Sequence, residues 1–169
     1  MMPDVHRPAR YFRLTGWLTS PAARLNRTAH YRVQLQRLRA DLSENQVLLL
    51  SFCLLPNAWH LVVAAPDRRS VDSLAGRVTA TQRAASDGSA VPLPVVVAPI
   101  RAAADLIDHC VFVERRPVAL GLVRQAQDWP WCSPAERFRL QTRVPLVSAP
   151  ILMSQMWLDG LLGAVPPVW

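Results

Sequence analysis

The chain has 169 residues, of which 51% are hydrophobic, and this fits one domain with a sizeable core. Its formal net charge is +7, and all 19 basic residues are arginine. No apolar run approaches the length of a membrane span, and the N-terminal segment lacks the apolar stretch of a signal peptide, so we expect a cytoplasmic protein without a membrane partner. The widely spaced Cys53, Cys110 and Cys132 argue against a disulfide framework or a cysteine zinc site.

The basic charge has two interpretations. A surface of this charge suits a polyanion such as nucleic acid. A GC-rich genome would also favour arginine over lysine, because its codons favour Arg, Ala, Pro and Val. Charge alone therefore does not establish a nucleic-acid partner.

The first half of the chain predicts a strand, a helix and a hairpin. The expected strands cover residues 10–18, 46–55 and 58–65, and the expected helix covers 28–44. Thr28 suits an N-cap of that helix, whose apolar residues recur with helical spacing. The run 46–55 is almost continuously apolar, which is typical of a central strand. The turn signal Pro56-Asn57 then makes 46–65 a hairpin.

The second half predicts two further helices around one strand, followed by short helical segments. We expect a helix over 70–85, a loop over 85–90, a strand over 91–100, a helix over 101–115 and a short helix around 134–139. Two prolines, Pro92 and Pro94, indicate that the strand lies at a sheet edge. Pro117 is expected to end the helix before it.

This order of elements predicts an α+β ferredoxin-like sandwich, an antiparallel sheet with helices packed on one face, plus a C-terminal helical extension. The domain is expected over residues 10–140. Residues 141–169 would form a C-terminal tail with a short helix around Met153–Leu162.

Two sequence blocks carry a resemblance to a known family. FVERRPVALGLVRQAQDWPWCS, residues 112–133, resembles a block that reads Tyr-hydrophobic-Glu-x-Asn-Pro-x-x-Ala-Gly-Leu-Val and ends in Trp-x-Trp-Ser-Ser. LPNAWHLVV, residues 55–63, resembles the strand Met-Pro-Asn-His-x-His-Leu. Both belong to the REP-associated single-tyrosine transposases, HUH nucleases that cut single-stranded DNA, and the resemblance covers roughly residues 10–140.

The resemblance implies a defined mechanism. In such enzymes two histidines on one strand and a third polar ligand from a helix hold Mg²⁺ or Mn²⁺. The metal polarises the scissile phosphate, and a helix-borne tyrosine attacks it to form a 5′-phosphotyrosine.

The sequence departs from the family at each of these positions. Ala58 stands where the first histidine is expected, so only His60 remains. The tyrosine is expected near Ala80 and the third ligand near Ala84. The family's basic Gln-Gly-Arg-Phe-Lys strand maps onto the apolar residues 92–96. We therefore expect no catalytic residue, no confident metal site and no bound cofactor.

The remaining polar residues have structural interpretations. His60 alone is expected to form a local hydrogen bond, because a metal site needs three or more protein ligands. The only tyrosines, Tyr11 and Tyr31, are expected to pack rather than to react. Asp105 and His109 have i,i+4 spacing and suggest a surface hydrogen bond.

The positions that still match the family serve turns, helix ends and packing. They are Pro56, Asn57, Leu61, Glu114, Pro117, Gly121, Leu122, Val123, Trp129 and Trp131. The sequence thus indicates a preserved scaffold without its chemistry.

Several arginines suit phosphate contacts. The candidates for DNA binding are Arg10, Arg13, Arg24, Arg27, Arg115, Arg116 and Arg124, with Arg32, Arg37 and Arg39 on the first helix. The first hypothesis is a transposase-like protein that is catalytically inactive and keeps some binding to single-stranded or hairpin DNA. The alternatives are a domesticated module that binds nucleic-acid hairpins, and a protein-interaction scaffold or homodimer formed through 91–100 and the apolar tail.

Overall fold

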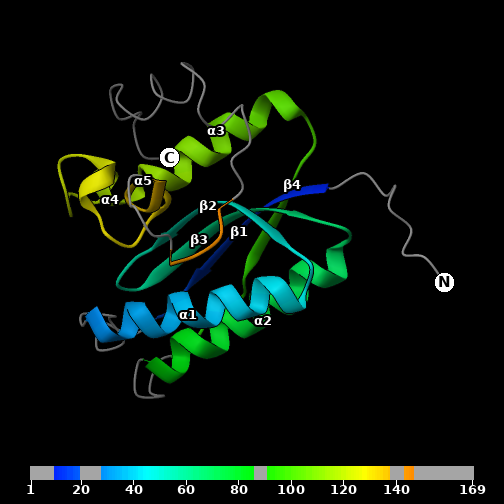
Figure 1. Ribbon diagram of the computed structural model, residues 1–169, viewed down its shortest axis with the longest axis horizontal. Helices are drawn as coiled ribbons and strands as arrows, with labels where there is room; N and C mark the ends of the chain where they lie inside the picture. Colours follow the sequence, from blue (N-terminus) through cyan, green and yellow to red (C-terminus); the bar gives the residue numbers. More distant parts are fainter. Residues whose placement is uncertain (1–9, 20–27, 86–90, 138–142, 147–169) are drawn as a thin grey trace.

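The computed structural model describes residues 10–19, 28–85, 91–137 and 143–146 (Figure 1). The β-α-β-β-α-β part consists of β1 (Arg10–Trp17), α1 (Thr28–Glu44), β2 (Leu48–Leu54), β3 (Ala58–Ala65), α2 (Arg68–Ala85) and β4 (Val96–Ile100). The helices α3 (Ala103–Glu114), α4 (Arg116–Ala119) and α5 (Ser133–Arg137) follow, with the short 3₁₀ helix η2 (Ala126–Asp128) before α5. The predicted element order and the α+β class are confirmed.

The four strands form one antiparallel sheet in the order β2-β3-β1-β4. The predicted hairpin is confirmed, because β2 pairs with β3 from Leu48↔Ala64 to Leu54↔Trp59. β3 and β1 are the inner strands, and all eight residues of β3 are buried.

The prediction that 46–55 is a central strand is wrong, because β2 lies at one edge of the sheet. Its apolar composition has another cause. Residues from the C-terminal part of the described chain cover that edge, through isolated bridges from Cys53 to Cys132 and from Leu49 to Leu146. A covered edge strand is buried like a central one, so the apolar pattern does not separate the two cases.

The other edge is β4, which confirms the edge position predicted for 91–100. The regular strand is shorter than expected, and Pro92 before it forms only an isolated bridge to Leu18. Pro99, which pairs with Phe12, has no N–H to donate to a further strand. Three large apolar residues of this segment are exposed, namely Val91, Leu93 and Val96.

Helices cover both faces of the sheet (Figure 1). α1 and α2 pack on one face, where Leu14, Leu61 and Val63 share a core with helix residues such as Leu35 and Leu74. This is the helical layer that the ferredoxin-like prediction expects.

The C-terminal extension covers the opposite face. There, α3 packs on β2 and β3, and Cys110 and Val113 share a second core with Val62 and Ala64. Side chains alternate between the two faces along β3, so even-numbered residues from Ala58 to Ala64 point toward α3. This face contains the candidate site.

α3 ends at Glu114, before Pro117, as predicted, and Pro117 lies in the first turn of the next short helix, α4. The boundary between the domain and the expected tail differs from the prediction. Val144 is fully buried and Leu146 bridges to Leu49, so the beginning of the expected tail packs on the body. The helix expected around Met153–Leu162 lies outside the described residues, as does the loop expected over 85–90 except for Ala85, which ends α2. None of the described helices combines the length and the apolar character that crossing a membrane requires.

Candidate functional site

His60 lies in the middle of the sheet, on the face that α3 covers. Its directly opposite partner on β1 is Thr15. The Thr15 Oγ1 and His60 Nδ1 atoms are 3.1 Å apart, and both side chains are buried. This contact agrees with the local hydrogen bond expected for a lone strand histidine.

Two aromatic rings surround the His60 imidazole. Phe112 of α3 meets it edge-on, with ring centroids 6.3 Å apart, and Trp17 of β1 does so at 6.5 Å. His60 is 3% exposed, whereas Phe112 is 42% exposed. Phe112 is therefore the more accessible side chain of this pair.

The environment of His60 favours its neutral form. Burial and the charges of Arg116 and Arg13 lower its pKa to about 3. Its Nε2 atom is buried and has no hydrogen-bond partner among the described residues. The imidazole is thus a neutral group within a positively charged environment.

The two arginines meet at Phe112 from different elements. The guanidinium carbon of Arg13 on β1 lies 4.8 Å from the Phe112 ring centroid, and that of Arg116 on α4 lies 5.4 Å from it. Both distances are within the range of cation–π attraction. The fold therefore brings together two of the predicted DNA-binding arginines, which lie about a hundred positions apart in the chain.

Arg13 also contacts His109. Its Nη1 donates to His109 Nδ1 at 3.3 Å. Burial and the charge of Arg13 lower the pKa of His109, while Asp105 and Asp108 raise it. Asp105, the hydrogen-bond partner expected from helical spacing, thus acts on His109 through its charge, and Arg13 supplies the hydrogen bond.

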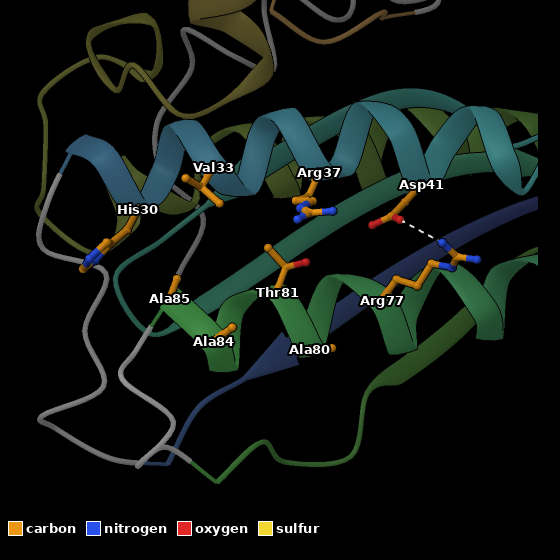
Figure 2. A pocket seen from close by; sticks show the side chains of 9 residues that line it. All are labelled: His30, Val33, Arg37, Asp41, Arg77, Ala80, Thr81, Ala84 and Ala85. Carbon is orange, nitrogen blue, oxygen red and sulfur yellow. Dashed lines mark hydrogen bonds and ion pairs between the residues drawn. The ribbon is translucent and has the colours of Figure 1, made fainter.

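The three alanines predicted to mark an altered active site do not meet. Ala58 is buried in the α3-side core, on the same face as His60. Ala80 and Ala84 belong to α2, across the sheet, and line a groove between α1 and α2 (Figure 2). Neither adjoins His60.

Phe112, whose ring meets that of His60, is the first residue of the C-terminal block. The block aligns with the quoted family pattern without a gap from Phe112 to Gly121, so Phe112 stands where that pattern begins with a tyrosine.

The described residues do not fit a catalytic metal ion. None of them form a group of three or more His, Cys, Asp or Glu side chains able to hold one. Ala58 and Phe112 offer no ligand atoms, and the Arg13 and Arg116 cations would repel a divalent ion near His60.

Neither tyrosine is placed to replace a nucleophile. Tyr31 is 4% exposed and stacks on Trp131 at a centroid distance of 4.9 Å, and burial raises the pKa of its hydroxyl. Tyr11 precedes Thr15 by four residues on β1, about 13 Å along an extended strand. Tyr31 is therefore inaccessible, and Tyr11 lies away from the His60 side chain.

The other predicted DNA-binding arginines are dispersed. Arg10 is exposed, but alternation along β1 places its side chain on the opposite face from Arg13. Arg124 is exposed, whereas Arg115 is only 8% exposed and is therefore poorly placed to contact DNA. Arg24 and Arg27 lie outside the described residues.

No protein-family model and no curated protein matches the chain. Among solved structures, the fold is similar to that of a REP-associated tyrosine transposase bound to a REP hairpin, with a TM-score of 0.66 and 18% sequence identity. That match covers 87% of this chain and 93% of the transposase chain. The intact alpha subunit of aIF2 from Pyrococcus abyssi matches 60% of this chain and 37% of its own, with 16% identity and a TM-score of 0.38.

Proposed function

We propose that this protein is a transposase-like protein that binds single-stranded or hairpin DNA and does not cut it. The observation that supports the proposal is the composition of the surroundings of His60. The imidazole has Ala58 beside it on β3 and Phe112 against it from α3. A fold similar to that of a transposase thus carries, around His60, residues that supply neither a second metal ligand nor a nucleophile.

The chemistry of these side chains explains why we expect no DNA cleavage. Phosphotyrosine formation needs a phenolic oxygen, and the Phe112 ring has none. Activation of the phosphate needs a metal or an equivalent polarising group, and a single neutral imidazole does not hold a divalent ion. We therefore expect no covalent protein–DNA intermediate.

DNA binding is supported by charge and by fold. The chain carries a net charge of +7, and arginine forks suit phosphate oxygens. The transposase of similar fold is described as bound to a REP hairpin. Arg13, Arg116 and Arg124 are at least partly exposed on the described surface.

The test combines binding and cleavage on structured single-stranded DNA. The full chain is incubated with a labelled hairpin oligonucleotide, with Mg²⁺, with Mn²⁺ and with EDTA, and analysed on native and denaturing gels. We expect a shifted band that weakens with salt, and an uncut oligonucleotide in all three conditions. A nicked product or a covalent adduct would overturn the inactivity, and no binding at low salt would overturn the DNA partner.

An interaction scaffold is a second candidate, favoured by the exposed apolar side chains of Val91, Leu93 and Val96 beside the β4 edge. It predicts a homodimer in solution. Light scattering coupled to size-exclusion chromatography separates the two cases. A dimer that Val96→Asp disrupts supports the scaffold, and a monomer at all concentrations contradicts it.

A further inference from the structure

We infer that Arg13, Arg116 and Phe112 form a metal-independent binding site for a phosphodiester group of the DNA. The inference rests on the proposed DNA binding and names the group through which this part of the surface would act. In this site two guanidinium cations carry the positive charge that a divalent ion would supply in a metal-dependent nuclease.

The first argument is the convergence of charge. Arg13 and Arg116 come from β1 and α4, and both guanidinium groups lie within 5.4 Å of the same ring centroid. Among the described residues, no carboxylate forms an ion pair with either of them. Two un-neutralised cations around one ring leave the local potential positive, which attracts an anion.

The second argument is accessibility. Phe112 is 42% exposed, and the Arg13 and Arg116 side chains are partly exposed, so a ligand can reach them from solvent. His60 behind the ring is 3% exposed. A phosphate would therefore contact the guanidinium N–H groups, and a neighbouring base could contact the exposed part of the Phe112 ring.

The third argument concerns the titratable groups on the elements packed around the ring. α3 contributes His109, whose Nδ1 accepts from Arg13, and the carboxylates of Asp105 and Asp108, which act on His109 through their charge. β3 contributes the neutral His60, which meets the Phe112 ring. Neither carboxylate forms an ion pair with Arg13 or Arg116 among the described residues, so both guanidinium groups keep N–H donors for a phosphate.

The test measures hairpin affinity by fluorescence anisotropy for the full chain and for matched variants. Arg13→Gln and Arg116→Gln remove one site cation each. Arg68→Gln and Arg69→Gln remove exposed cations of α2 on the far layer. We expect each site variant to weaken binding about tenfold and to reduce the salt slope by about one. The α2 variants should leave the affinity within about twofold.

A second arm tests the metal and the fold. EDTA should leave the affinity of the unmodified protein unchanged, and unchanged circular dichroism should show that each variant is folded. Equal affinities for site and control variants, or loss of binding in EDTA, would overturn the inference while leaving DNA binding intact.

A third arm separates this inference from the proposed function. Inorganic phosphate is titrated into ¹⁵N-labelled protein, and the Nε–Hε signals of Arg13 and Arg116 are followed. Their selective movement supports the phosphate site even if no hairpin binds, a result that would contradict the proposed function alone. Unmoved signals together with hairpin binding would overturn the site, and equal binding of an RNA hairpin would show recognition of the phosphate rather than the sugar.

Discussion

Gly16 is required by the packing of one large side chain. It pairs with Trp59 across β1 and β3, and a Cβ atom at position 16 would overlap the Trp59 indole ring. Trp59 is 0% exposed, so the ring has no room to move. We predict that Gly16→Ala destabilises the protein by about 1–3 kcal/mol, measured by urea unfolding.

Gly76 provides the matched control for this substitution. A Cβ atom there meets nothing within 4 Å, and the residue lies in the exposed face of α2. Gly76→Ala should therefore stabilise the protein by up to about 1 kcal/mol. Equal effects of the two substitutions would contradict the packing argument.

His60 should make the protein more sensitive to acid. Its pKa in the folded state is about 3, below the ordinary value of 6.5, so below pH 6.5 the unfolded chain binds a proton that the folded chain does not. Its contribution is present above pH 6.5 and is lost as pH falls toward 3, with a slope of at most about 1.4 kcal/mol per unit.

The measurement is unfolding free energy from pH 7 to pH 4, for the unmodified protein and for His60→Gln. We predict that the variant loses less stability over this range, since glutamine does not titrate. A ¹H NMR titration of the His60 ring would contradict the prediction if its midpoint lay near 6.5.

At the scale of single residues, the sequence predicted that His60 has no second histidine beside it and forms a local hydrogen bond. It did not predict the partners of that histidine. Thr15, Phe112 and Arg116 are each more than forty positions away from His60 in the chain, and only the fold brings them together. A pattern of local spacing contains no information about such contacts.

At the scale of the elements, the residue after the end of α1 has a conformation that suits glycine, but the residue there is glutamine. Gln46 has φ of 54°, and Val47 N–H donates to the Leu42 carbonyl, as in a Schellman C-cap. A left-handed conformation costs a side chain about 1 kcal/mol, so we predict that Gln46→Gly stabilises the protein by about 0.5–1 kcal/mol.

The matched control is Gln36→Gly in the exposed middle of the same helix. There glycine should destabilise by about 0.5–1 kcal/mol, the opposite sign. Thermal unfolding of both variants checks the pair, and a loss of stability in both would contradict the assignment of Gln46 as the cap.

The elements themselves were largely predictable, because apolar spacing, prolines and turn residues determine where helices and strands begin and end. The position of β2 was not. A strand buried by neighbouring strands and one buried by a C-terminal segment have the same composition, and only the bridges from Cys53 and Leu49 distinguish them.

At the scale of the whole molecule, the Ser133 hydroxyl is one of the groups that connect the C-terminal layer to the sheet. Ser133 Oγ accepts the Phe52 N–H, lies 3.0 Å from the Phe52 carbonyl oxygen and contacts the Ser51 hydroxyl, all of them buried. We predict that Ser133→Ala costs about 1–3 kcal/mol, because it leaves buried backbone groups of β2 unsatisfied.

Urea unfolding again measures the effect, and Ser73→Ala on the exposed face of α2 is the control, expected to change stability by less than about 0.5 kcal/mol. Equal stability of the Ser133 variant and the control would show that water replaces the lost hydrogen bonds. The remaining hydrogen bonds between the two layers, such as those of Trp129 and Trp131 with Leu54, and the apolar packing would then suffice to hold them together.

The residues that cover the β2 edge come later in the chain, so the ribosome makes them after β2 itself. Trp129, Trp131 and Ser133 complete the hydrogen bonds of a strand that ends at Leu54. A ribosome adding about 5–20 residues per second needs several seconds to reach them. During that interval the apolar edge LLLSFCL lacks its C-terminal cover, which exposes the nascent chain to aggregation through this strand or makes it depend on a chaperone.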